Sequence, residues 1–115
     1  MGRDKYYISQ TDADKFEMIY PMIGSMYKEM KDLSSKKADG ALNKLKIKMI
    51  NRLLNTAQEL LKDHPTIKFL EILDDDTIPQ NSDVTLILKQ YIDALIQFKN
   101  DHIDYNHRWN IEDQD

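Results

Sequence analysis

Cysteine is absent from this chain, and glycine and proline are scarce, with three of each among 115 residues. Without cysteine there can be no disulfide framework, no thiolate metal site and no thiol nucleophile. Phosphate-cradling loops need several glycines close together, so the Walker loop and the dinucleotide-binding turn are excluded. The lack of cysteine fits a reducing compartment, and we expect a cytoplasmic protein.

Long apolar runs are also lacking. No stretch approaches 18 uncharged apolar residues, which is the length that a transmembrane helix needs. Residues 1–10 carry Arg3, Asp4 and Lys5 and have no apolar segment of the kind found in signal peptides. We therefore expect neither secretion nor contact with a membrane.

The charges that are present are unevenly distributed. The formal net charge is −4, with 31% charged and 41% hydrophobic residues, which is a composition typical of a folded domain. Residues 28–62 contain nine Lys or Arg and four Asp or Glu, a net charge of +5, whereas residues 63–115 contain four and twelve, a net charge of −8. We expect a bipolar molecule rather than a uniformly acidic one.

The residue usage predicts an all-α fold, because Leu, Ile, Met and Lys are abundant and helix breakers are rare. We expect one domain over residues 1–115, with flexible ends at 1–10 and 110–115. The helical periodicity of apolar residues predicts a small bundle of three long helices and one short helix.

The first long helix is expected to begin after Thr11 and to be kinked or broken near Pro21. The second is expected over residues 41–62 with Asp39 as its cap, and its apolar arc of roughly 200° indicates packing against two neighbours. His64-Pro65 ends this helix, and residues 66–73 suit a short helix. The last helix is expected to begin at Ser82 and to run to about Ile103.

Catalytic and metal motifs are poor. The three histidines, His64, His102 and His107, have no recognisable nucleophile or base motif around them. Asp101-His102-Ile103 resembles the opening of an HNH-type nuclease motif, but the match covers only these three residues. That family needs a following Asn and a second His on a ββα unit, whereas His102 is expected on a helix and the chain ends soon after. A zinc or nickel site from His102, Asp104 and His107 is disfavoured, since positions five apart do not share a helical face.

The acidic triplet at residues 74–76 lacks the glycine and glutamate of an EF-hand loop. We therefore predict no catalytic residue, no metal site and no cofactor. An enzyme or metal-dependent nuclease using the His102/His107 tail is the third of the three functions that we consider.

A basic stretch is the first candidate surface. Lysines and asparagines on the polar side of the second helix could neutralise phosphates and reach base edges. The candidate nucleic-acid contacts are Lys36, Lys37, Lys44, Lys48, Asn51 and Arg52. The alternative interpretation is a solvated outer face, since a central amphipathic helix must present soluble side chains to water.

Methionines and a tyrosine on the first helix are the second candidate surface, because flexible thioethers adapt to varied partners. The candidate partner face consists of Met18, Met22, Met26, Tyr27 and Met30. Our first hypothesis is a non-enzymatic helical interaction or regulatory subunit, of a bacterial or phage type, that binds another protein or itself. The alternative is a nucleic-acid-binding regulator that uses the basic stretch from Lys36 to Arg52.

Overall fold

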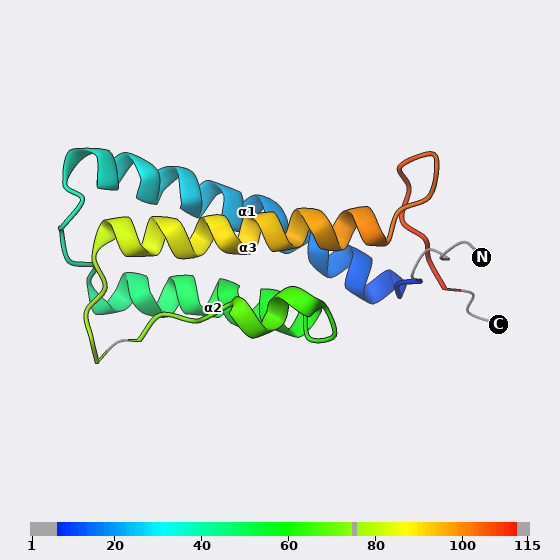
Figure 1. The fold of residues 1–115 in the computed structure, drawn as a ribbon, viewed down its shortest axis with the longest axis horizontal. Helices are drawn as coiled ribbons and strands as arrows, with labels where there is room; N and C mark the ends of the chain where they lie inside the picture. The colour runs from blue at the N-terminus through cyan, green and yellow to red at the C-terminus, as the bar shows by residue number, and fades with distance from the viewer. Residues whose placement is uncertain (1–6, 75, 113–115) are drawn as a thin grey trace.

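A computed structural model describes residues 7–74 and 76–112 and is mostly helical (Figure 1). It contains α1 (Gln10–Lys36), α2 (Lys44–Leu60), the 3₁₀ helix η1 (Pro65–Phe69) and α3 (Asn81–Asp101). The described residues form no strand, only isolated backbone bridges. The predicted all-α class, with three long helices and a short one, is confirmed.

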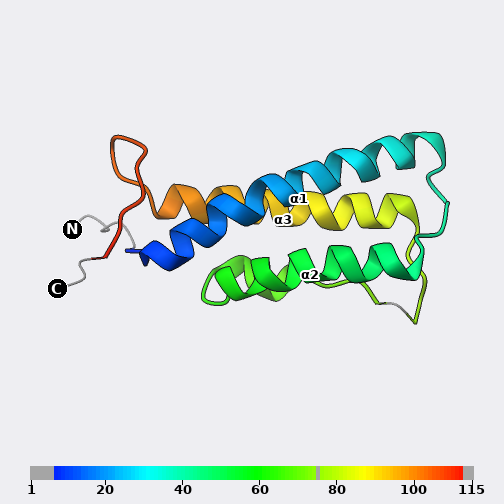
Figure 2. The same ribbon diagram turned by 180° about the vertical axis from the view of Figure 1, so that it is seen from behind.

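The three long helices lie alongside one another in a molecule of 50 × 23 × 22 Å. α1 runs in one direction, and α2 and α3 both run in the opposite direction (Figures 1 and 2). α1 contacts both other helices, whereas α2 and α3 touch each other little. Because α2 and α3 are parallel, the chain between them has to return, and it does so through η1 and a segment that runs back along α2 (Figure 1).

α1 begins earlier than the sequence indicated and continues through its proline. Ser9, rather than Thr11, is the N-cap, and its side chain accepts a hydrogen bond from the backbone N–H of Asp12 at 3.0 Å. The predicted break at Pro21 is wrong, because α1 is one helix of 27 residues. Pro21 and Glu17 are both exposed, so the Glu17 carbonyl that loses its helical donor lies on the solvent side. A kink at Pro21 stays a prediction.

The boundaries of the later helices differ by a few residues from those expected. α2 begins at Lys44 with Asn43 as its cap, since the Asn43 side chain accepts from the Lys46 N–H at 2.8 Å, and the predicted cap Asp39 is exposed. The short helix is η1, a 3₁₀ helix that ends at Phe69 rather than near Leu73. α3 begins one residue before the predicted cap Ser82 and ends at Asp101.

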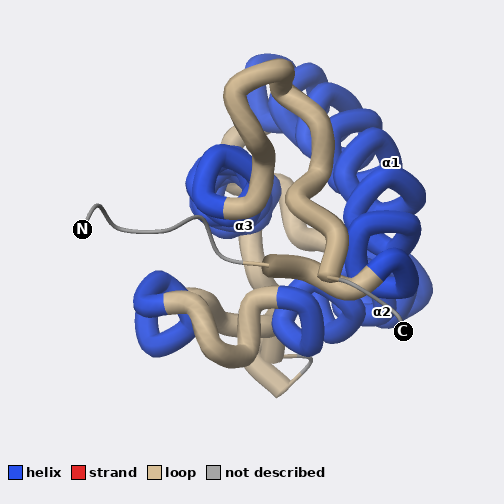
Figure 3. The backbone as a smooth tube through the Cα atoms, turned by 90° about the vertical axis from the view of Figure 1, so that its right-hand side faces the viewer, coloured by secondary structure: helices blue, strands red, loops and turns tan. Residues whose placement is uncertain are grey.

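The buried apolar side chains form one cluster to which all three long helices contribute. The helices present their predicted faces to it, with Phe16 and Ile23 from α1, Ile50 from α2 and Tyr91 from α3 each at most 1% exposed. Seen from one end in Figure 3, the helices surround this core and loops cover their ends. Burial of these side chains is the main stabilising contribution to such a fold.

The described parts of the two ends of the chain are paired with each other. Ile8 is 4% exposed and forms a parallel bridge with Ile111. Its N–H donates to the Asn110 carbonyl at 3.0 Å, and its carbonyl accepts from the Glu112 N–H at 2.9 Å. Of the ends expected to be flexible, Ile8 and residues 110–112 are thus hydrogen-bonded, while residues 1–6 and 113–115 lie outside the described residues.

Candidate functional site

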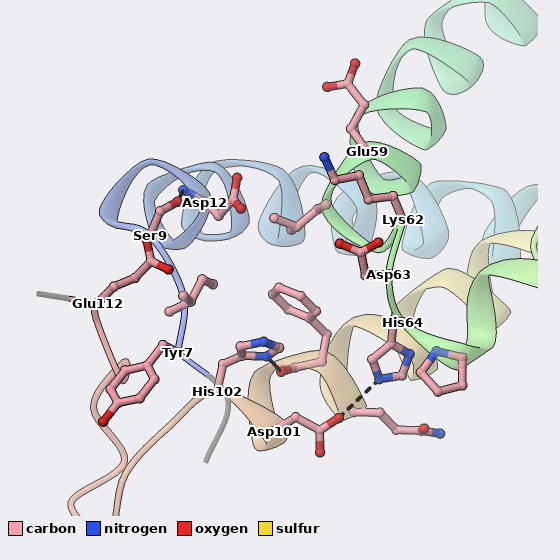
Figure 4. A pocket seen from close by; sticks show the side chains of 15 residues that line it. Tyr7, Ser9, Asp12, Glu59, Lys62, Asp63, His64, Asp101, His102 and Glu112 are labelled. Carbon is pink, nitrogen blue, oxygen red and sulfur yellow. Dashed lines mark hydrogen bonds and ion pairs between the residues drawn. The ribbon is translucent and has the colours of Figure 1, made fainter. Parts of the chain in front are cut away.

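A cleft of about 680 Å³ lies where the end of α2 and the end of α3 meet the start of α1 (Figure 4). Its volume falls within the usual range of small-molecule sites. Side chains from four stretches of the chain line it: Tyr7, Ile8, Ser9, Asp12, Glu59, Leu60, Lys62, Asp63, His64, Pro65, Gln97, Phe98, Asp101, His102 and Glu112. Two of the three histidines thus share one concave surface.

His64 joins two segments that are 37 residues apart. Its Nδ1 accepts from the backbone N–H of Thr66 at 3.3 Å and lies 2.9 Å from the Thr66 hydroxyl oxygen. An N–H group can only donate, so the proton of the neutral ring is assigned to Nε2, which donates to Oδ2 of Asp101 at 3.2 Å. The side chain of His64 is only 8% exposed, while that of Asp101 is 44% exposed.

The hydrogen bonds of His64 with Asp101 and Thr66 connect two segments of the chain. A general base needs a lone pair directed at the proton that it removes. The free lone pair of His64 is directed at the Thr66 amide and hydroxyl, where His64 is the N-cap of η1. The pair therefore fastens the turn after α2 to the last residue of α3.

His102 also has a structural contact in the cleft. Its Nδ1 lies 2.7 Å from the Phe98 carbonyl oxygen, one helical turn back, and its ring lies 4.3 Å from the Phe98 ring between centroids. This agrees with the expectation that His102 is a helix-end residue. His107 is exposed in the loop after α3 with a φ of 62°. Within residues 7–74 and 76–112, no three His, Asp or Glu side chains come together as a metal-binding group would require.

The charges around the cleft are predominantly negative. Five carboxylates line it, against the ammonium group of Lys62 and the two histidines. The last carbonyls of α2 and α3, which carry the negative end of each helix dipole, lie at the same end of the molecule. The lining therefore favours cationic over anionic groups.

The basic stretch is divided by the structure. Lys44, Lys48 and Arg52 are exposed on the outer face of α2, four residues apart, and form no ion pair with any described residue. Lys36 belongs to α1 and forms an ion pair with Asp32 at 3.3 Å, and Lys37 is exposed just after that helix. Three of the six candidate residues thus form one row, which we call the basic row: Lys44, Lys48 and Arg52.

Asn51 does not share the outer position of the basic row. Its Nδ2 donates to the Leu73 carbonyl at 2.8 Å, and its Oδ1 accepts from the Leu73 N–H at 2.7 Å. Both groups of the amide are therefore used inside the molecule, where they attach the returning segment to α2. Two turns further along α2, Gln58 Nε2 donates to the Leu70 carbonyl at 3.3 Å and to the Tyr91 hydroxyl at 2.9 Å.

The candidate partner face on α1 is also divided. Met30 is 0% exposed and belongs to the core, so it is not available to a partner, and Met26 and Tyr27 are half-buried against the core. Met18 and Met22 are 59% and 49% exposed. The apolar face of α1 is wide enough to bury one edge between α2 and α3 while the other edge stays in solvent.

Other exposed apolar side chains lie beside the basic row. Leu45 and Met49, each one residue after a lysine of the row, are 67% and 45% exposed. On a helix, positions 45 and 49 form their own row next to 44, 48 and 52. The outer face of α2 therefore combines cations with apolar surface.

The cleft itself was missed from the sequence. His64 and Asp101 are too far apart in the chain for any spacing rule to connect them, and His64 was read only as the residue before a helix-ending proline. The single available signal was compositional, because His64-Pro65-Thr66 can cap a short helix through its polar side chains.

No helix within the described part of the chain is long and apolar enough to cross a membrane. Comparison of the chain with protein-family models, with curated proteins and with solved structures finds no match.

Proposed function

We propose that this protein is a non-enzymatic helical interaction subunit, of regulatory or adaptor type, which binds a protein partner through the outer face of α2. The observation that carries the proposal is the exposure of Leu45 and Met49 on a helix face that also carries three cations, none of which forms an ion pair within residues 7–74 and 76–112. Apolar side chains exposed together with a rim of charge are typical of protein-binding surfaces.

The cleft supports a non-enzymatic role. His64, whose side chain is only 8% exposed, uses both ring nitrogens in contacts with Thr66 and Asp101. No serine or threonine of the lining is placed against the free side of a base, since Ser9 caps α1. This geometry favours a structural use of the cleft residues over acid–base chemistry.

A nucleic-acid-binding regulator is the second candidate, and the basic row favours it. Residues four apart on a helix rise about 6 Å per step, so the three cations form an extended row, and rows of cations bind nucleic acid by neutralising its phosphates. Asn51 is the side chain best suited to reading a base, but both groups of its amide are hydrogen-bonded to the Leu73 backbone. This candidate function is therefore limited to sequence-independent binding of phosphates.

Photo-crosslinking in the cells that naturally contain the protein separates the two candidates. A benzophenone amino acid at position 45 should form adducts with protein, and the same group at position 86 should not. Leu86 is a matched control, because it is the same residue type with a similar exposure, 61%, on a different helix, α3. Adducts with nucleic acid at position 45 would favour the second candidate, and equal protein adducts at both positions would refute the proposed surface.

A further inference from the structure

The returning segment carries a second strip of unpaired charge next to the basic row. Glu71, Asp74 and Asp76 are exposed, and none forms an ion pair with a described residue. Two apolar side chains in the same segment, Ile72 and Ile78, are 45% and 56% exposed. We call these five residues the acidic strip. It has the same mixture of charged and apolar groups as the face of α2, with the opposite sign.

The structure fixes the acidic strip beside α2 at two points. Asn51 holds Leu73 through the two hydrogen bonds already described. Near the start of α2, the Leu42 N–H donates to the Pro79 carbonyl at 3.0 Å, and Ala41 forms an antiparallel bridge with Gln80. Figure 1 shows the described part of the segment before residue 75 running back along α2. The acidic strip therefore belongs to a segment that is attached to the helix carrying the basic row on both sides of the strip's last two charges.

We infer that the partner bound by the outer face of α2 is a second copy of this chain, in a two-fold dimer. In a two-fold dimer, an axis that passes between the basic row and the acidic strip brings each strip of one copy against the oppositely charged strip of the other copy. The basic row of one copy then faces the acidic strip of its partner, and the reverse pairing forms at the same time. This inference rests on the proposed function, because it names the partner of the same surface.

Charge complementarity favours this occupant over a polyanion. A nucleic acid on the basic row would also approach Glu71, Asp74 and Asp76, whose carboxylates repel phosphate. A second copy instead offers carboxylates to the cations and cations to the carboxylates. The same contact would cover the exposed apolar side chains beside the charges. These are Leu45 and Met49 next to the basic row, and Ile72 and Ile78 in the acidic strip.

The interface implied by these residues is small, and its polar pairs are at the surface, so we expect a weak dimer that dissociates more readily as salt is raised. Sedimentation velocity of the full-length chain over a wide concentration range measures this directly. The mass should rise from monomer to dimer with concentration, and higher salt should shift the transition to higher concentration. A monomer at every concentration would overturn the inference.

Two charge-reversed variants provide a sharper test. Lys48→Glu/Arg52→Glu makes both strips acidic, and Glu71→Lys/Asp76→Lys makes both strips basic. Asp74 is left unchanged because its carboxylate accepts the Asp76 N–H at 2.9 Å within the loop. Each variant alone should weaken self-association by roughly tenfold or more, since like charges then face each other in both contacts.

Mixing the two variants should restore association. In the mixed dimer the acidic α2 of one chain meets the basic strip of the other, and the acidic strip of the first meets the basic α2 of the second. A variant that merely failed to fold could not be rescued in this way. If the mixture stays monomeric while each variant keeps the helical circular dichroism of the parent, the inference is wrong.

Lys28→Glu/Lys31→Glu is the matched control, because it changes net charge equally on exposed positions of α1. It should leave self-association unchanged, and a loss as large as that of the α2 variant would point to net charge rather than to this surface. A purified chain that remains monomeric while position 45 still crosslinks to other proteins in cells would refute the dimer and leave the proposed function standing.

Discussion

The hydroxyl group of Tyr91 can be removed with little change of shape, and its contacts allow the cost to be worked out. The side chain is 0% exposed, and its O–H donates to the Glu71 carbonyl at 2.9 Å. Its oxygen accepts from Gln58 Nε2 at 2.9 Å. Tyr91→Phe leaves the Glu71 carbonyl without this donor and leaves Gln58 with only the longer bond to Leu70.

Each of the two lost hydrogen bonds contributes about 0.5–1.5 kcal/mol net, so the loss of both costs about 1–3 kcal/mol. For a domain of this size, a change of 1 kcal/mol in the free energy of unfolding shifts the Tm by about 4 °C, so Tyr91→Phe should lower the Tm by roughly 4–12 °C. Urea unfolding and calorimetry measure both quantities. Tyr105→Phe is the control, because Tyr105 is 98% exposed, and its stability should stay within about 0.5 kcal/mol of the parent.

The same substitution changes the response to alkali. Burial raises the pKa of Tyr91 above its ordinary value of 10.0, against the lowering effect of the Gln58 hydrogen bond. The folded state therefore keeps this proton when the unfolded state begins to lose it. The resulting stability is present below pH 10 and is lost as the pH rises through the folded pKa. Tyr91→Phe should lose stability less steeply above pH 10 than the parent does. Equal stability and equal alkaline slopes for the Tyr91 and Tyr105 variants would refute the reasoning.

Two further changes test other contacts. Asn51→Ala removes both hydrogen bonds to Leu73 and should lower the free energy of unfolding by about 1–3 kcal/mol in urea, whereas Asn55→Ala, at an exposed position of the same helix, should change it by less than about 0.5 kcal/mol. The Arg108 backbone N–H holds the pKa of Asp104 below its ordinary value of 3.8, so the stability that this carboxylate contributes is present above that pH and lost as the pH falls through the folded pKa. Asp104→Asn should flatten that acid-side loss in circular dichroism titrations, and an unchanged acid limb would contradict this account.

The amphipathic helices could be predicted because each long helix buries one face, and a buried face requires apolar residues at helical spacing. Phe16, Ile23 and Ile50 fall on the faces that helical periodicity makes apolar, and all three are buried. Helix ends were predicted less well. Ser9 and Thr11 are both good caps, and the sequence does not indicate which hydroxyl will meet a free N–H, because that depends on where Ile8 is held.

Contacts between a helix and irregular backbone could not be predicted. Asn51 has the polarity of a solvent-facing residue, and its periodic position places it near the basic row. Its actual partner is Leu73, which lies in a segment without a repeat that could reveal its path. The cleft depends in the same way on the returning chain, since His64 and Asp101 meet only after that chain has turned.

The Ile8–Ile111 bridge leaves the chain's points of entry and exit side by side. A domain of this kind can be inserted into a surface loop of another protein without distorting the loop. The two points of insertion need to be no further apart than two paired backbones, as Ile8 and Ile111 are. Donor and acceptor fluorophores fused before Ile8 and after Glu112 would sit close enough for strong energy transfer. If Ile8 and Glu112 separated, the energy transfer would fall, and this fall could be followed in real time.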